Sequence, residues 1–266
     1  SDIAIGIYAG GGAGAAVTNT GLVDAYGVYG AAGVVALGDG SGATVDNSGE
    51  ITGTAKYGNA FGVIAYGDDA SVSNDVGAVI QGISLYGDAA GVQAYAGIGQ
   101  AVVSNDGYVG ARALYGSAVG IYAAGYAGAN VTNGGTVLSI GYNAATGIDA
   151  YSAGTASVAN SGTVVAVSYG SAVGIDSRGF SAYAANSGRV YAYSYYSDAV
   201  GISVNGQGGV AGVVNDGLVR AESDYGVATG ITAGGTYGAA VYNTGAVYAF
   251  GYLGAYGIVA RSEERR

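Results

Sequence analysis

The sequence predicts an all-β protein: a right-handed parallel β-helix (β-solenoid) with three strands per coil. Two short patterns recur along the whole chain, and no segment shows a helical period. Self-similarity at a period between 20 and 50 residues is typical of solenoids and other repeat arrays. The first pattern, Ala-x-Gly-[Ile/Val], has its glycines at positions 6, 33, 62, 91, 120, 147, 174, 201, 230 and 257. The second, Ala-x-Val-x-Asn-x-Gly-x-Val-x-Ala, is centred on Asn19, Asn47, Asn74, Asn105, Asn133, Asn160, Asn186, Asn215 and Asn243.

The spacing of the glycine markers predicts about nine to ten coils of 27–29 residues. Successive markers are separated by either 27 or 29 residues. A change of two residues preserves the side-chain parity of a strand, whereas a change of one would reverse its faces. Because the repeat runs without a break, we expect residues 1–266 to form a single β-solenoid domain, with 262–266 as a short charged tail. Coils about 4.8 Å apart would give a rod roughly 45 Å long.

The second pattern alternates between apolar and polar residues. In its second copy, Ala43, Val45 and Ile51 share one parity, while Asp46 and Glu50 have the other. This alternation predicts two strands with one buried face. The asparagine falls between them on the inward parity, where a buried amide must find hydrogen-bond partners. We therefore expect the asparagines to form a structural ladder, with the glycine two residues later supplying a positive φ at the bend.

The first pattern predicts the third strand of each coil. Val119, Ile121 and Ala123 alternate with smaller or polar neighbours, so we expect these three side chains to share one face. The right-handed sense of the coil follows the general rule for parallel crossovers.

Composition limits the functions that the chain can have. The net charge is −10, whereas nucleic-acid binding and anionic membrane surfaces both require basic patches. No apolar run approaches the ~18 residues of a membrane-spanning helix. Histidine and cysteine are absent, so zinc has no ordinary ligands. We expect no cofactor, no metal, no nucleic acid partner and no membrane span in this chain. Residue 1 is serine and methionine is absent, which suggests a processed product or an excised fragment.

Tyrosine gives the most regular surface feature. One tyrosine precedes the Ala of Ala-x-Gly-[Ile/Val] by three residues in eight coils: Tyr57, Tyr86, Tyr115, Tyr142, Tyr169, Tyr196, Tyr225 and Tyr252. Rings repeated at the coil spacing can stack on one another. This aromatic column is predicted either to stiffen one corner of the rod or to form an adhesive edge for glycans or a second rod.

Acidic residues supply weaker candidates for a site. Asp149 and Asp176 each follow Gly-Ile, so they would lie one coil apart, with Arg178 close by. Two carboxylates about 5 Å apart are the catalytic arrangement of a retaining glycosidase. Without supporting groups, however, the three residues are more simply two surface carboxylates beside an arginine. Asp68, Asp69 and Asp88 could hold calcium between turns, but solvated turn carboxylates explain them better.

The units Val45-Asp46-Asn47-Ser48-Gly49-Glu50-Ile51 and Val158-Ala159-Asn160-Ser161-Gly162-Thr163-Val164 resemble the Asn-Ser-Gly-x-Ile repeats of bacterial autotransporter passengers and related exported β-helix adhesins. The resemblance covers essentially the whole chain. It implies a right-handed β-helix located extracellularly or on the bacterial cell surface, where such chains serve as adhesins or stalks. The high tyrosine content and the scarcity of lysine depart from the usual pattern.

These observations predict a non-enzymatic extracellular structural protein: a surface adhesin or stalk segment, or a self-associating, fibre-forming unit. Terminal coils expose unpaired strand edges, so we expect end-to-end self-association. Contact with glycans or a host surface is a further possibility. The alternatives are a glycan-binding module and a carbohydrate-active β-helix enzyme centred on Asp149, Asp176 and Arg178.

Overall fold

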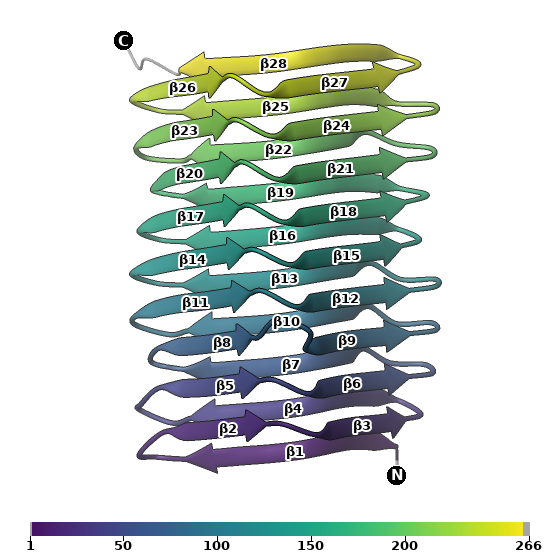
Figure 1. Ribbon diagram of the computed structural model, residues 1–266, viewed down its shortest axis with the longest axis vertical. Helices are drawn as coiled ribbons and strands as arrows, with labels where there is room; N and C mark the ends of the chain where they lie inside the picture. The colour runs from purple at the N-terminus through teal and green to yellow at the C-terminus, as the bar shows by residue number, and fades with distance from the viewer. Residues whose placement is uncertain (1, 263–266) are drawn as a thin grey trace.

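The computed structural model describes residues 2–262, which form 28 β-strands and no helix. The chain winds into a stack of coils, and each coil adds one strand to each of three parallel sheets (Figure 1). The N-terminal strand lies at one end of the stack and the C-terminal strand at the other (Figure 1). The predicted all-β parallel solenoid with three strands per coil is therefore confirmed.

The first sheet has ten strands. They are β1 (Ile3–Gly11), β4 (Gly30–Gly38), β7 (Ala60–Gly67), β10 (Ala89–Ala96), β13 (Ala118–Gly125), β16 (Ala144–Ser152), β19 (Ser171–Gly179), β22 (Ala199–Gly206), β25 (Val227–Gly235) and β28 (Gly254–Ser262). The predicted charged tail therefore begins inside a strand at Ser262, and residues 263–266 lie outside the described range.

The second and third sheets have nine strands each. The second sheet contains β2 (Ala15–Asn19), β5 (Ala43–Asn47), β8 (Ala70–Asn74), β11 (Gln100–Asn105), β14 (Gly128–Asn133), β17 (Thr155–Asn160), β20 (Ser181–Asn186), β23 (Val210–Asn215) and β26 (Gly238–Asn243). The third contains β3 (Leu22–Gly27), β6 (Glu50–Ala55), β9 (Val79–Ser84), β12 (Tyr108–Ala113), β15 (Thr136–Gly141), β18 (Thr163–Ser168), β21 (Arg189–Ser194), β24 (Leu218–Ser223) and β27 (Ala246–Gly251).

Strand pairing places equivalent residues of successive coils beside one another. Asn133 of β14 pairs with Asn160 of β17, and Val137 of β15 pairs with Val164 of β18. Isoleucine or valine with alanine from the first sheet, valine and alanine from the second, and valine or isoleucine from the third fill the interior. Each column of buried side chains therefore repeats along the rod, and the stability of one coil depends mainly on its two neighbours.

The first sheet departs from strict alternation at the glycine of Ala-x-Gly-[Ile/Val]. Gly120 and Ile121 are consecutive and both buried, whereas Val119 is only half-buried. The prediction that Val119, Ile121 and Ala123 share one face is therefore wrong for Val119. Glycine is required at this break because a Cβ on Gly120 would overlap the Val137 side chain of the opposite sheet.

The break in alternation creates a second, smaller core. The alanine two residues before the glycine is buried against small residues of the third sheet. Ala89, Ala111, Ala113 and Ala118 form one such cluster, separate from the main interior. Alanine therefore fills one corner of the rod, while the larger isoleucine and valine side chains fill its centre.

The glycine after each asparagine has a different role from the one predicted. Positive φ occurs within residues 2–262 at Gly14, Gly40, Gly77 and Gly238, and so not at Gly21 or its equivalents in most coils. The constraint is close approach instead. A Cβ on Gly49 would overlap the carbonyl oxygen of Gly21 in the preceding coil. The bend therefore requires glycine because backbones of neighbouring coils touch there.

Candidate functional surfaces

The bend between the second and third sheets, here called the asparagine corner, is a continuous buried hydrogen-bond ladder. Each asparagine Nδ2 donates to the Oδ1 of the asparagine one coil further on, over 2.6–2.8 Å, from Asn19 to Asn243. Several amides also donate to the carbonyl oxygen two residues later in their own bend, as Asn160 does to Gly162 over 3.3 Å. The predicted inward asparagine column therefore satisfies its polar atoms internally and has a structural role.

The turn between the third and first sheets, here called the tyrosine corner, contains all eight predicted column residues. Neighbouring rings lie with centroids 5.2–6.4 Å apart. Tyr29 adds a ninth ring, 5.9 Å from Tyr57. The pattern missed Tyr29 because this residue precedes Ala31 by two positions rather than three. The predicted eight rings are between 46% and 79% exposed, so the column is a surface feature that remains accessible.

Asp149, Asp176 and Arg178 come together on the outer face of the first sheet. Asp149 pairs with Asp176 across β16 and β19. Arg178 donates from Nη2 to both carboxylate oxygens of Asp149 over 2.8 Å, and its Nε lies 3.0 Å from Asp176 Oδ2. The Asp149 and Asp176 side chains are only 14% and 20% exposed, so they are not the solvated carboxylates that the sequence suggested.

The pKa of Asp176 reflects both its burial and its charged neighbours. Burial raises the pKa of Asp176, the nearby Asp149 carboxylate adds to that rise, and the Arg178 guanidinium opposes it. Asp176 Oδ1 is buried and accepts no hydrogen bond within the described range. Arg178 thus contacts both oxygens of Asp149 through Nη2 and one oxygen of Asp176 through Nε.

Several of the acidic turn residues cap the backbone of the next coil. Asp69 Oδ1 accepts a hydrogen bond from the Gln100 backbone N–H, and Asp88 Oδ1 accepts one from Ser117 N–H, both over 2.8 Å. Among residues 2–262, no group of three or more acidic side chains is close enough to hold a metal ion. Both carboxylates therefore bind the backbone of the following coil.

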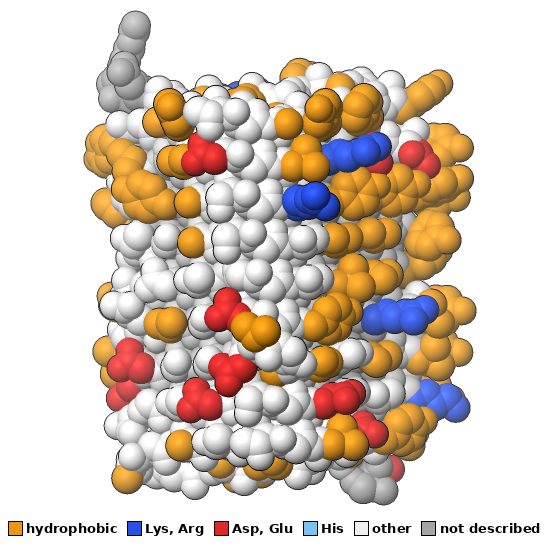
Figure 2. Space-filling view, in the orientation of Figure 1, with side chains coloured by type: hydrophobic (Ala, Val, Ile, Leu, Met, Phe, Trp, Pro, Cys, Tyr) orange, Lys and Arg blue, Asp and Glu red, His pale blue; other side chains and the backbone are white. Residues whose placement is uncertain are grey.

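The outer face of the third sheet is a surface that the sequence analysis missed. Its outward positions are apolar in the middle coils, where Ile83, Leu138, Ile140, Val165 and Val167 lie. Of the six Lys and Arg residues in 2–262, four lie on or directly beside this sheet: Lys56, Arg112, Arg189 and Arg220. In Figure 2 the large blue groups accordingly gather on the right, over the third sheet and among hydrophobic side chains.

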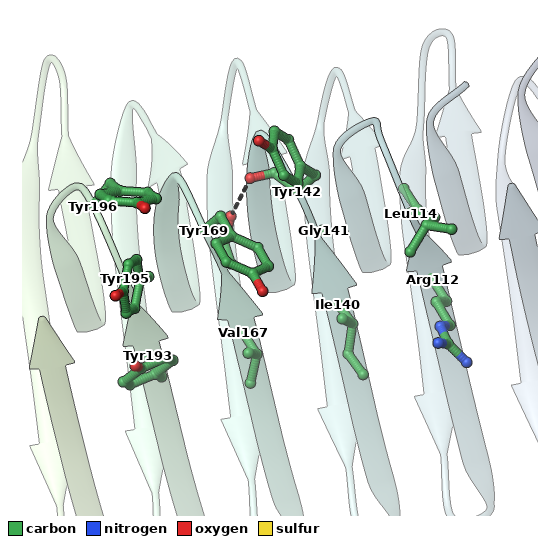
Figure 3. Close-up of a pocket in the computed structure, with 12 residues that line it drawn as sticks. Arg112, Leu114, Ile140, Gly141, Tyr142, Val167, Tyr169, Tyr193, Tyr195 and Tyr196 are labelled. Carbon is green, nitrogen blue, oxygen red and sulfur yellow. Dashed lines mark hydrogen bonds between the residues drawn. The ribbon is translucent and has the colours of Figure 1, made fainter. Parts of the chain in front are cut away.

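Tyrosines give this face a shallow groove of about 460 Å³. Figure 3 shows Arg112, Ile140, Val167 and Tyr193 in a row on successive strands, with Tyr195 beside Tyr193 where the chain enters the turn. Further along, the Tyr193 hydroxyl donates to Asp224 Oδ2 over 2.7 Å. That hydrogen bond, with a smaller contribution from burial, raises the pKa of Tyr193 to about 12. A sequence signal did exist. The outward-facing positions of the second pattern carry polar residues in the second coil and mainly apolar residues in the fifth and sixth.

A second aromatic groove lies where the first sheet turns into the second. Tyr66, Tyr95, Tyr126 and Tyr151 line a volume of about 320 Å³. The Arg178 guanidinium lies over the Tyr151 ring, 6.0 Å from its centroid. This groove is open and shallow.

The fold and these surfaces define the class of the protein: it is a parallel β-solenoid repeat protein with a buried asparagine ladder and a stacked tyrosine column. The comparisons add no narrower assignment, since no family model, no curated protein and no solved structure matches the chain. Within residues 2–262, no helix is long and apolar enough to cross a membrane.

Proposed function

We propose that the chain is a non-enzymatic structural module of an extracellular or cell-surface rod, working as a stalk or adhesin segment that associates with further copies. The observation that carries this proposal is the unbroken asparagine ladder, which links nine coils through one repeated hydrogen bond. Such a ladder favours a stiff spacer rather than a scaffold for a mobile active site. The location rests on the resemblance to exported β-helix adhesins.

Limited proteolysis of intact cells of the source organism tests the location. An extracellular rod should be released or shortened by a protease added outside the cells, while a cytoplasmic marker stays intact. Protection of the chain until the cells are lysed would contradict an extracellular role. The released rod should then appear in negative-stain electron micrographs as an elongated particle.

The alternative of a carbohydrate-active enzyme depends on Asp149 and Asp176. Because Arg178 holds both carboxylates, we expect the protein to leave a panel of polysaccharides undegraded, and the combined Asp149→Asn and Asp176→Asn variant to behave identically. Reducing-end release and ultraviolet absorbance of unsaturated products measure hydrolysis and elimination respectively. A degrading activity that disappears in the double variant would establish the enzyme instead.

A glycan-binding role is supported by the groove of Tyr66, Tyr95, Tyr126 and Tyr151. If the groove binds sugars, replacing Tyr126 and Tyr151 by alanine should abolish retention on a glycan array. Tyr237→Ala, which removes an exposed tyrosine outside the groove, is the matched control. Equal retention of both variants would exclude this groove.

Self-association is supported by two kinds of surface. In the described range β1 and β28 are the outermost strands of the first sheet, and strands at a sheet edge can recruit another chain end to end. The third-sheet face can pair side by side, because aromatic residues and arginine around apolar side chains are the composition that protein interfaces favour. Nine strands about 4.8 Å apart and six residues long give this face roughly 38 Å by 20 Å, which approaches the ~800 Å² per partner of a standard interface.

Charge favours an antiparallel side-by-side pair. Lys56 directly follows β6, the second strand of the third sheet, and Asp224 directly follows β24, the eighth. A twofold axis along β15, the fifth strand, would therefore place Lys56 of each copy opposite Asp224 of the other. A parallel pair would instead place Arg220, in the middle column of the face, opposite itself, and like charges directly opposite are destabilising.

A charge-swap series tests this pairing. Lys56→Asp and Asp224→Lys should each weaken self-association by about tenfold, and the combined variant should restore it, because opposite charges face each other again. Sedimentation velocity gives the dimer fraction, and light scattering at rising concentration reveals end-to-end filaments. Failure of the double variant to recover would rule out the antiparallel register, whereas a monomer at all concentrations would contradict both modes.

A further inference from the structure

Tyrosine is the only readily oxidised side chain in this protein. The chain contains 25 tyrosines and no cysteine, methionine, tryptophan or histidine. Cysteine thiolates and methionine thioethers normally take up oxidative damage in proteins, and here they are absent. A one-electron oxidant that reaches this surface therefore has phenol rings as its main target.

The tyrosine corner keeps those rings close to one another. Tyr57, Tyr86 and Tyr115 are the best aligned: their centroids lie 5.4 and 5.2 Å apart, with interplanar angles of 13° and 9°. All three are about half exposed and lie in turns, outside the strands on either side. An oxidised ring therefore always has a second phenol beside it, which replaces a bimolecular encounter by a neighbouring contact.

We propose that the tyrosine column is a site of oxidative cross-linking, in which rings one coil apart join as dityrosine. Each of two tyrosines loses one electron and its phenol proton to give a phenoxyl radical. The two radicals couple through ring carbons ortho to oxygen, forming one C–C bond, and both rings regain aromaticity as the ortho hydrogens move to the oxygens. Two electrons and two protons leave in total. Hydrogen peroxide acting through a haem peroxidase accepts them and becomes two molecules of water.

The consequence is a covalent staple between coils. Members of the column are 27–29 residues apart in sequence, so each bond closes a loop of that length. Closing such a loop restricts the unfolded chain, as a disulfide does, and the folded geometry already holds the two ends together. A rod without cysteine thus has a route to covalent reinforcement under oxidising conditions. This inference does not depend on the proposed role as a stalk or adhesin.

The molecule contains its own control for the importance of stacking. Tyr66, Tyr126 and Tyr237 are 54%, 66% and 78% exposed, the same range as the column. In the part of the chain that the structure describes, none of these three rings packs against another tyrosine or phenylalanine ring. If exposure alone determined cross-linking, the two groups would react alike.

The test treats the dilute, purified chain with a haem peroxidase and hydrogen peroxide. Dityrosine fluorescence gives the yield, and peptide mass spectrometry locates each bond from the loss of two hydrogens. We expect intramolecular links that join Tyr57 to Tyr86 and Tyr86 to Tyr115. The cross-linked chain should also unfold at a higher urea concentration than the untreated chain.

Two variants make the test decisive. In the first, Tyr29 and the eight column tyrosines are replaced by phenylalanine, which preserves the stacked rings but removes the hydroxyls. Its intramolecular dityrosine yield should fall about tenfold. In the described range the variant keeps one pair of neighbouring tyrosine rings, Tyr95 and Tyr122, which lie 5.1 Å apart and are tilted by 51°. In the second, Tyr66, Tyr126 and Tyr237 become phenylalanine, and the yield should stay unchanged. Equal yields in the two variants, or links found only between molecules, would overturn the proposal.

Discussion

The asparagine corner and the tyrosine corner repeat equally often along the rod, yet they tolerate variation very differently. The ladder bonds stay within 2.6–2.8 Å from one end to the other. Ring separations at the tyrosine corner range from 5.2 to 6.4 Å, and interplanar angles range from 9° to 53°. A buried amide must be satisfied with good geometry in every coil, because an unpaired buried donor is costly. Half-exposed rings can tilt, since water solvates the part of each ring that its neighbour does not cover.

This difference predicts that the asparagine corner is the fragile one. The largest effect should come from Gly162→Ala, because the new Cβ would overlap the carbonyl oxygen of Gly135, a backbone atom that cannot rotate away. We expect a loss of about 3 kcal/mol in the free energy of unfolding, near the upper end for overpacking. Urea denaturation measures it.

Gly21→Ala is the matched control for that substitution. Gly21 occupies the same column, but a Cβ there would have no heavy atom within 4 Å. It should therefore cost much less than Gly162→Ala. Equal losses at Gly21 and Gly162 would show that backbone conformation, rather than contact between coils, requires the glycine.

The next effect is expected at the ladder itself. Asn160→Leu would remove the acceptor of Asn133 and the donor to Asn186 in one step. Leaving buried amide groups unsatisfied should cost about 2 kcal/mol. Asn243→Leu, at the exposed end of the ladder and with one ladder bond, should cost distinctly less. A thermal melt of Asn160→Leu that matches the parent protein would contradict the role of the ladder.

A smaller effect is expected at the tyrosine corner. Tyr115→Leu removes stacking on Tyr86 and a tilted contact with Tyr142. Aromatic pairs contribute about 0.5–1.5 kcal/mol beyond their buried area. We therefore expect a loss within that range, compared with almost none for Tyr126→Leu, whose ring is exposed and unstacked. If Tyr115→Leu costs more than Asn160→Leu, the ranking of the two corners is wrong.

The pH dependence of stability separates a third environment from both corners. Burial raises the pKa of Asp176 above its ordinary value of 3.8, with Asp149 adding to the rise. The contribution of a raised pKa is fully present below pH 3.8 and is lost as pH increases through the folded-state pKa. The stability of Asp176→Asn relative to the parent should therefore increase with pH over that window. Parallel stability curves for the two proteins would contradict the shift.

Repetition made most of the fold predictable. Val, Asn and Gly at fixed spacing indicated the parallel sheets, the inward amides and the number of coils, because a solenoid places equivalent residues in register. The eight column tyrosines followed from the same spacing. The prediction failed where two consecutive residues, Gly120 and Ile121, face inward, since a period-two pattern cannot show a local break in alternation.

The sequence by itself determined the solenoid, its asparagine ladder and the position of its tyrosine column, since each depends on a periodic pattern within one chain. Tertiary structure alone decided which non-repeating side chains of neighbouring coils contact one another and how deeply they are buried. It buried the Asp149 and Asp176 carboxylates against Arg178, whose proximity the spacing had indicated, and it gathered four of the described cations and an apolar band on the third sheet. The physical reason is that residues 27–29 positions apart become neighbours only when the coils stack, so a surface assembled from different side chains leaves no repeating signal in the sequence.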